Sequence, residues 1–571
     1  MDIHNLIKSF FKEIKQYKNN KIIILFNKRY PKYLSNNDLF ILIINIILII
    51  SLIFPISSYK IKYKEKKLCS NSEIIIKVKD SNTQEIINSE FYYKPDEVYL
   101  NGESYDLIDG NKVANLDYNI NTILMRWYNQ LTTCQNMFES ITSIVEIDLS
   151  NFNFSKVSST EKMFYQCVGI KYIYLNNSID TSFLITMNSM FYFAQSLRFF
   201  NLSNFDTSQV TNMDYLFAEC HSLTSLNTSS LITSNCLSMK YLFSNCGSLK
   251  TLDLSNFNTT LVKDMQGMFK NCQTLQILDL SNFRTNSVVD MQFMFNNCTS
   301  LLSLNLNNFN TSLVTNMKQM FSNCQSLTSI DIFNFDTKSV NNMQYMFYRC
   351  SSLGALDLSS FDSSLVTDMQ NMFSDCNSLT SLNLHNFNTS SVKSMKHMFN
   401  YCQSLRFLDV SNFNTSLIND TEYMFSNCNS LTSLNLSSFN TSLVANMEKM
   451  FYNCFSINSL NLSNFDTSLV TNMMNMFEGC LSLLYLNLKK FTINPLLVNA
   501  DMFRNTYINI IYCLSDSMNI DKIRALLQEK ECSYNDCSNN WEKNIYSIAS
   551  GMENHIKIFD KKCDYSNFHY C

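Results

Sequence analysis

The chain has 571 residues, of which 46% are hydrophobic and only 16% charged, and its formal net charge is −4. With 8 Gly and 4 Pro in the whole length, the composition excludes collagen, flexible Gly-rich linkers, Pro-rich spacers and a glycine-rich phosphate loop. Length alone predicts several domains of about 100–200 residues each, but an internal repeat replaces that expectation with one long core.

A basic head, residues 1–38, precedes one long apolar segment. From Met1 to Asn36 the net charge is +6, so the remainder carries about −10. Leu39 to Ile56 consists almost entirely of Leu, Ile and Phe, and its eighteen residues are just enough to cross a hydrocarbon core of about 30 Å. We predict a transmembrane signal-anchor, because a cleaved signal peptide has a shorter head. A cleaved signal and a buried core helix are the alternatives.

The orientation of this segment does not follow from charge. Five lysines between Lys60 and Lys67 balance the basic residues on the amino side, so the positive-inside rule does not decide the topology. The five cysteines from Cys513 to the end of the chain favour an oxidising compartment. Sequons such as Asn258-Thr-Thr are compatible with that placement. We therefore expect a single-pass protein of the cell membrane with its repeats outside the cell.

Residues 57–133 are predicted to form a β-rich amino-terminal cap. Apolar and polar residues alternate after Glu73, as expected for a strand with one buried face. Asn101-Gly102 fits a tight hairpin turn, because both residues tolerate positive φ.

Residues 134–506 are organised by a 26-residue repeat. A phenylalanine preceded by Met or Leu recurs in fourteen steps, and every step has this period except the one to Phe191, which is longer by a single position. These phenylalanines are Phe138, Phe164, Phe191, Phe217, Phe243, Phe269, Phe295, Phe321, Phe347, Phe373, Phe399, Phe425, Phe451, Phe477 and Phe503. A fixed period in this range predicts a solenoid of about fourteen stacked coils.

One unit, Cys246 to Asn271, predicts the structure of each coil. Leu252 and Leu254 would point to one side of a short strand, and the Asn and Thr residues that follow favour a turn. After the turn, apolar residues from Val262 to Cys272 fall at helical intervals. We therefore predict an α/β solenoid, a right-handed coil with a parallel sheet on one face and short helices on the other.

The repeat also carries a family resemblance. From Leu301 to Cys324 it follows L-x-x-L-[DN]-L-S-x-F-[DN]-T-S-x-V-x-x-M-x-x-M-F-x-x-C with few departures, and it resembles the BspA-like leucine-rich-repeat surface proteins of bacteria and protists. That resemblance implies a leucine-rich-repeat-like fold, an exposed adhesion or matrix-binding role and no enzymatic activity. Where ordinary leucine-rich repeats carry a buried Asn, this chain has Phe257 and its repeats. An aromatic stack is expected to replace the Asn ladder.

Further repeated positions, occupied by Cys and by Met, suggest a metal or disulfide site. They are better explained as buried core residues. A cysteine recurs with the same period from Cys220 to Cys480, with side chains expected to point the same way and not toward each other. Cysteine is often buried as a small hydrophobe, and methionine at helical spacing fills cores. We therefore expect a reduced, buried cysteine ladder and no metal site.

The outward strand positions are the candidate binding surface. From Asp253 to Asn487 the residue between the two leucines of each coil is Asp or Asn, and most residues two positions earlier are small. These acceptors could bind a peptide, a glycan or Ca²⁺, or they could bond along the stack and keep the edge soluble. Large residues that break the pattern are better markers of contact. The candidate binding residues are Asp331, Phe333, Asp357, His385, Phe407, Asp409 and Tyr485.

The sequence does not support catalysis or nucleic-acid binding. Only six histidines are present, and no pair has the spacing of a metal motif. The repeats also lack the basic stripe of a nucleic-acid-binding protein. We expect no enzyme activity and no cofactor.

Residues 507–571 are predicted to form a Cys-rich carboxy-terminal cap. A last strand near Tyr507 to Cys513 and a helix from Ile520 to Gln528 are expected, because a stack of open coils must be closed at its ends. The cysteines that could form disulfides are Cys513, Cys532, Cys537, Cys563 and Cys571.

These features lead to one main hypothesis of function. The chain is expected to be a membrane-anchored cell-surface repeat protein that binds a protein or glycan through its concave sheet. The alternatives are a structural coat or spacer without a specific ligand, and an intracellular scaffold.

Overall fold

The computed structural model describes residues 72–79, 83–114, 116, 118–507, 510–514 and 521–527. Every described residue belongs to the unit Leu68–Cys571. The basic head and the predicted membrane segment Leu39–Ile56 lie outside the described residues. Within the described ranges, no helix has the length and apolar character needed to cross a membrane.

The amino-terminal cap is the predicted β-rich segment. Its long strands pair antiparallel, and alternate residues of the first, Ile74, Ile76 and Val78, are buried. Asn101 and Gly102 have φ of 50° and 97° and form the predicted hairpin turn. The sheet has the order β4-β3-β6-β1-β7-β8, with strands β1 (Ser72–Val78), β3 (Glu97–Leu100), β4 (Glu103–Ser104), β6 (Asn121–Trp127), β7 (Ile144–Asp148) and β8 (Tyr172–Tyr174). A smaller ladder joins β2 (Gln84–Glu85) to β5 (Lys112–Val113).

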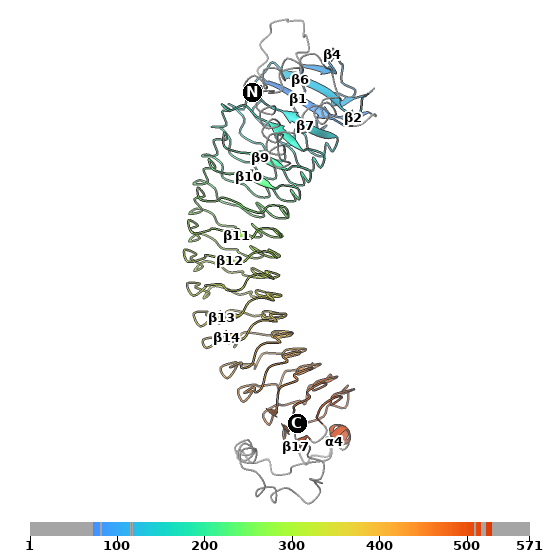
Figure 1. Ribbon diagram of the computed structural model, residues 1–571, viewed down its shortest axis with the longest axis vertical. Helices are drawn as coiled ribbons and strands as arrows, with labels where there is room; N and C mark the ends of the chain where they lie inside the picture. The colour runs from blue at the N-terminus through green and yellow to red at the C-terminus, as the bar shows by residue number, and fades with distance from the viewer. Residues whose placement is uncertain are drawn as a thin grey trace, which may run out of the picture. The chain divides into compact units, whose positions relative to one another are not determined.

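This cap leads directly into the solenoid. Strand β1 pairs antiparallel with β7, and β7 pairs parallel with β8, one coil further on. The antiparallel cap sheet therefore continues into the parallel stack without an open edge at the junction (Figure 1).

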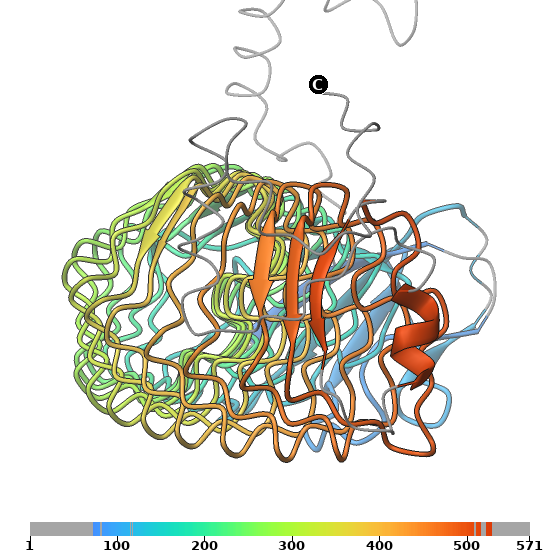
Figure 2. The same cartoon turned by 90° about the horizontal axis from the view of Figure 1, so that it is seen from below.

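The coils that follow stack in exact register with their repeat. Phe199 pairs with Ser225, Ala355 with Ser381 and Ser459 with Tyr485, each pair one repeat apart. Seen along the stack, the coils overlie one another and the last strands lie side by side on one face (Figure 2). The strands are β9 (Phe199–Asn201), β10 (Ser225–Asn227), β11 (Ile277–Leu278), β12 (Ser303–Leu304), β13 (Ala355–Asp357), β14 (Ser381–Asn383), β15 (Ser459–Asn461), β16 (Tyr485–Leu488) and β17 (Ile511–Leu514).

A second parallel ladder runs along the coils. One residue of each coil forms an isolated parallel bridge to the next, without a break from Ser159 to Val498. The prediction of a short helix after the turn of each coil is wrong. The only helix in the described part of the chain is α4 (Asp521–Leu527). The fold is a β-solenoid of about fourteen turns, not an α/β one.

Backbone hydrogen bonds explain the absence of helices from the coils. An α-helix needs every N–H to bond four residues back in its own segment. Here alternate N–H groups leave the coil: Gly267 donates to the carbonyl of Gln292 and Phe269 to that of Met294, both at 2.9 Å. The N–H groups between them close tight turns, as when Met268 donates to Met265. Each coil therefore has a double turn whose outward bonds bind it to its neighbour.

Two residues of each double turn have positive φ, which a helix does not tolerate. In the coil around Phe243 they are Tyr241 at 53° and Asn245 at 61°. The apolar side chains still face inward at the spacing that suggested a helix, because Met265, Met268, Phe269 and Cys272 are fully buried. Two turns thus reproduce the burial pattern of a short amphipathic helix.

The core consists of repeated side chains stacked on their own copies. Phe295 lies on Phe321 with ring centroids 5.6 Å apart, and Phe283 on Phe309 at 6.4 Å. The second stack confirms that Phe occupies the position of an Asn ladder. The thiol of Cys272 donates to the carbonyl of Phe243 at 3.2 Å, and other cysteines of the ladder repeat this contact. Each cysteine therefore serves as a small core side chain with a satisfied thiol.

Candidate binding surface

The outward side of the strands forms a continuous polar surface, which we call the strand face. In β13, Leu356 is buried, whereas Ala355 and Asp357 on either side are exposed. The same alternation holds for Ser381, Leu382 and Asn383 in β14. The structure thus places the residues between the leucines outward, as the sequence pattern predicts.

The Asp and Asn residues of the strand face are fixed by bonds within their own coil. Oδ1 of Asp357 accepts the backbone N–H of Ser359 at 2.9 Å, and Oδ1 of Asp409 accepts that of Ser411 at 3.0 Å. These side chains are therefore held mainly by hydrogen bonds within their own coil. One of the two interpretations of the ladder expected bonds along the stack instead. The N–H of Ser359 lowers the pKa of Asp357, so this carboxylate is ionised at neutral pH.

Large apolar side chains interrupt this polar surface. Phe333 is 62% exposed and Phe407 70% exposed, although both are surrounded in register by small or polar residues. Ile277 and Phe199, at 67% and 53%, lie on the same face and were not among the predicted residues. Their outward position could have been read from the repeat, since both occupy the strand position of Phe407.

The structure gathers six of the seven candidate residues into four consecutive coils. Asp331 and Phe333 are in the first of these coils, Asp357 in the second and His385 in the third. Phe407 and Asp409 follow in the fourth, where the side chain of Ser411 and, more weakly, the charge of His385 lower the pKa of Asp409.

Tyr485 differs from the other six. It lies three coils further on, where it pairs with Ile511 of β17 and is half-buried. Burial raises its pKa. It therefore belongs to the junction with the carboxy-terminal cap and not to the exposed part of the strand face.

The predicted cysteine cluster of the carboxy-terminal cap is described only in part. Cys513 is buried in β17, whereas Cys532, Cys537, Cys563 and Cys571 lie outside the described residues. Among the residues that the structure describes, no group of three or more His, Cys, Asp or Glu side chains is placed to hold a metal ion.

Three solved structures are similar to the chain. The complex of TLR13 with ssRNA13 aligns at 18% identity over 68% of this chain and 56% of that chain, with a TM-score of 0.24. A leucine-rich repeat protein from Eubacterium ventriosum aligns at 15% identity over 52% of this chain and 80% of its own, with a TM-score of 0.27. The functional domain of InlJ from Listeria monocytogenes, which includes a cysteine ladder, aligns at 15% identity over 72% and 74%, with a TM-score of 0.16. The chain spans just over half the length of the first of these.

No curated protein matches the chain in sequence. One family does match, described as Mycoplasma protein of unknown function, DUF285. Its matches overlap at residues 111–198, 132–251, 171–278, 237–349, 263–381, 326–407 and 404–510. Because these segments together cover more than half of the sequence, the chain belongs to the DUF285 family.

Proposed function

We propose that this chain is a non-enzymatic surface repeat protein that binds a macromolecular partner through the strand face. The observation that carries the proposal is the exposure of Phe407, 70% of which is open to solvent. The same position in neighbouring coils is occupied by Ser381 and Ser433. The fold therefore does not need an aromatic residue here, whereas binding surfaces use such residues as anchors.

The chemistry of the surface favours a protein partner with apolar and basic side chains. Covering Phe333 and Phe407 would contribute roughly 1.5–3 kcal/mol for each fully buried side chain. Asp331, Asp357 and Asp409 each use Oδ1 for a backbone N–H, which leaves Oδ2 to accept from a Lys or Arg. A glycan is the alternative ligand, since the same oxygens accept hydroxyl groups.

Membrane attachment is part of the proposal. The apolar segment Leu39–Ile56 would hold the chain in the membrane with the repeats outside the cell, in keeping with the resemblance to BspA-like surface proteins. Adding protease to intact cells tests this topology. Cleavage of the repeats from outside supports it, and protection of the repeats with cleavage of the head would favour an intracellular scaffold.

A second candidate function is a structural coat or spacer. It is favoured by the bonds of the Asp and Asn ladder, because each side chain already has a backbone partner in its own coil. A polar strip of this kind keeps a sheet face soluble without any ligand. The exposed phenylalanines are the feature that this alternative does not explain.

Replacing the phenylalanines by the usual residue of their column separates the two candidates. Binding of full-length chain to an immobilised basement-membrane extract is measured for the wild type and for the double variant Phe333→Ser, Phe407→Ser. We expect at least ten-fold weaker binding, because an aromatic anchor contributes about 2 kcal/mol or more. Leu443→Ser is the matched control, since Leu443 is an apolar side chain 47% exposed outside the strand face. If the double variant bound as tightly as the Leu443→Ser control, the assignment of the binding site to these phenylalanines would be wrong.

A further inference from the structure

The double turns present a second surface with its own ladder. From Asn245 to Asn453, the second positive-φ residue of most double turns is Asn, which tolerates this conformation better than most residues. These side chains bond from coil to coil: Asn271 Nδ2 donates to Asn245 Oδ1 at 2.6 Å, and Asn297 Nδ2 to Asn271 Oδ1 at 2.8 Å. The ladder resumes where Asn453 donates to Asn427 at 3.0 Å.

Three consecutive coils between these runs depart from Asn. They carry Arg349, Asp375 and Tyr401, with φ of 58°, 62° and 60°. Large residues also have positive φ in other double turns, such as Phe193 and Tyr241, so this conformation is a general feature of the fold. The three coils are distinguished by their chemistry, because they interrupt the Asn ladder with a cation, an anion and an aromatic ring.

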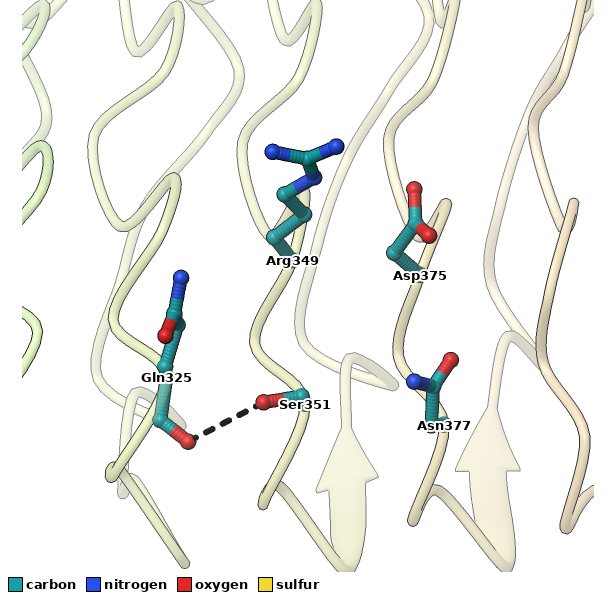
Figure 3. A pocket seen from close by; sticks show the side chains of 5 residues that line it. All are labelled: Gln325, Arg349, Ser351, Asp375 and Asn377. Carbon is teal, nitrogen blue, oxygen red and sulfur yellow. Dashed lines mark hydrogen bonds between the residues drawn. The ribbon is translucent and has the colours of Figure 1, made fainter.

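A surface depression of about 250 Å³ lies at the same place. Its lining comes from three consecutive coils and consists of Gln325, Arg349, Ser351, Asp375 and Asn377. Arg349 and Asp375 project side by side from neighbouring coils, with the amides and the hydroxyl beside them (Figure 3). Every lining side chain is polar, and two carry opposite charges.

Each charged group contacts its neighbour in the chain but forms no ion pair with a described residue. The guanidinium of Arg349 lies over the ring of Tyr348, 5.1 Å from its centroid. Oδ2 of Asp375 accepts the hydroxyl of Ser374 at 3.1 Å. Among the described residues, neither charge takes part in an ion pair within 4 Å.

The uncharged groups of the depression can also form hydrogen bonds to a ligand. Oδ1 of Asn377 is buried and accepts no hydrogen bond in the described structure, so this amide gains a bond if it turns toward a donor. Ser351 donates to the carbonyl of Gln325 at 3.3 Å, a long bond that a ligand oxygen could replace. In the next coil, Tyr401 is 41% exposed and adds an aromatic surface.

We propose that this depression binds a sugar unit that carries a carboxylate, as part of an acidic glycan. Arg349 pairs with the carboxylate through its two-pronged guanidinium, and Asp375 accepts sugar hydroxyls. Gln325, Ser351 and Asn377 supply the remaining donors and acceptors. A simple anion would be repelled by Asp375 and a simple cation by Arg349. The site is separate from the strand face and does not depend on the function proposed for it.

The test uses full-length chain and four small probes. Dissociation constants for glucuronic acid, glucose, acetate and glycine are measured by ligand-observed NMR titration. Glucuronic acid is expected to bind at least ten-fold more tightly than the other three. Equal binding of glucose would overturn the role of the carboxylate. Equal binding of acetate or glycine would overturn recognition of a sugar, and so would failure of glucuronic acid to bind.

Variants distinguish a binding residue from a structural one. Arg349→Asn restores the usual residue of the ladder, so the thermal midpoint is expected to stay the same or rise while affinity for glucuronic acid falls at least ten-fold. Asp375→Asn should weaken binding at least three-fold with no loss of stability. Gln403→Ala, at the position of Gln325 three coils further on, is the control and should bind as the wild type does. Unchanged affinity in Arg349→Asn would overturn the proposal.

Discussion

The hydroxyl of Thr285 is bound twice to one residue of the next coil: it donates to the carbonyl oxygen of Asn310 at 2.8 Å and accepts the N–H of Asn310 at 2.8 Å. The side chain is fully buried. The same buried position holds a hydroxyl in coil after coil, at Thr181, Thr207, Thr233, Thr259, Thr311, Thr337, Ser363, Thr389, Thr415, Thr441 and Thr467. This hydroxyl ladder binds each coil to the next at a turn where no strand pairs.

Thr285→Val tests the hydroxyl ladder. Valine keeps the shape of the side chain but leaves the N–H and the carbonyl of Asn310 without their partner. Each buried polar group left unsatisfied costs about 1–3 kcal/mol, so the free energy of unfolding should fall by about 2–4 kcal/mol. Urea unfolding followed by circular dichroism measures the change. Thr285→Ser should be close to wild type, because Ser363 makes the same two bonds at 2.9 Å.

Thr315→Val is the matched control. The Thr315 hydroxyl donates to the carbonyl of Val289 at 3.3 Å, but the same carbonyl also accepts the Thr315 N–H at 2.9 Å. Removing the hydroxyl therefore leaves no backbone group without a hydrogen-bond partner. The free energy of unfolding should change by no more than about 0.5 kcal/mol. A loss in Thr315→Val as large as in Thr285→Val would contradict the ladder.

The cysteine ladder predicts a loss of stability at alkaline pH. Burial raises the pKa of Cys350 to about 12, whereas an unfolded thiol titrates near 8.5. Between these values the unfolded chain releases a proton that the folded chain keeps. The stability is thus complete below about pH 8.5 and falls by about 1.4 kcal/mol per pH unit for each such thiol up to about pH 12.

Cys350→Ala isolates the contribution of one thiol. The alanine variant should be less stable than the wild type at pH 7.5, and the difference should shrink as the pH rises toward 10.5. Unfolding free energies at four pH values give the slope. Val366→Ala is the control, because Val366 is fully buried and does not titrate. A Cys350→Ala difference as independent of pH as that of Val366→Ala would contradict a buried, protonated thiol.

Gly267→Ala probes a close approach within the double turns. Gly267 has φ of 59°, and a Cβ there would lie 2.2 Å from Cε1 of Tyr241 and 2.4 Å from its Cδ1. The substitution should cost about 1–2 kcal/mol for the backbone and more for displacing the ring. Removing the ring in Tyr241→Ala should make a subsequent Gly267→Ala less costly, which a double-mutant cycle measures. Gly247→Ala is the control, since its nearest neighbour would be 4.0 Å away.

The sequence predicted the period, the strand registry and the outward face, because these follow from side chains that alternate around buried leucines. It did not predict the double turns, since Val262, Met265, Met268 and Phe269 are buried in either structure. The signal that separates the two was present. Asn245 and its copies at Asn271, Asn297, Asn323, Asn427 and Asn453 place a residue that tolerates positive φ inside the supposed helices of those coils.

Of the two candidate sites, the sequence predicted the strand face but not the depression on the double turns. Phe333 and Phe407 each interrupt a column of mostly small or polar residues, so the sequence alone could mark them. Arg349 and Asp375 belong to the double turns, which the sequence did not predict. That the two side chains line one depression therefore could not be read from the sequence.

The repeated ladders predict that a whole coil can be removed. Deleting residues 300–325 joins Thr299 to Ser326, which is the equivalent of Ser300 one coil further on. Thr285 would then meet Asp336 in place of Asn310, because the two occupy the same position of consecutive coils. Each remaining coil regains both neighbours, and solenoid stability is close to a sum over coils and interfaces. We expect a folded protein whose thermal midpoint falls by only a few degrees.

Deleting half a repeat, positions 300–312, is the matched control. It would shift the register by half a coil, so that the buried Phe stacks, cysteines and hydroxyls on the two sides no longer coincide. This variant should lose the cooperative transition in circular dichroism, or keep it only for the part on one side of the deletion. Equal damage from both deletions would mean that the coils are not interchangeable units, and that the core depends on features outside the repeat.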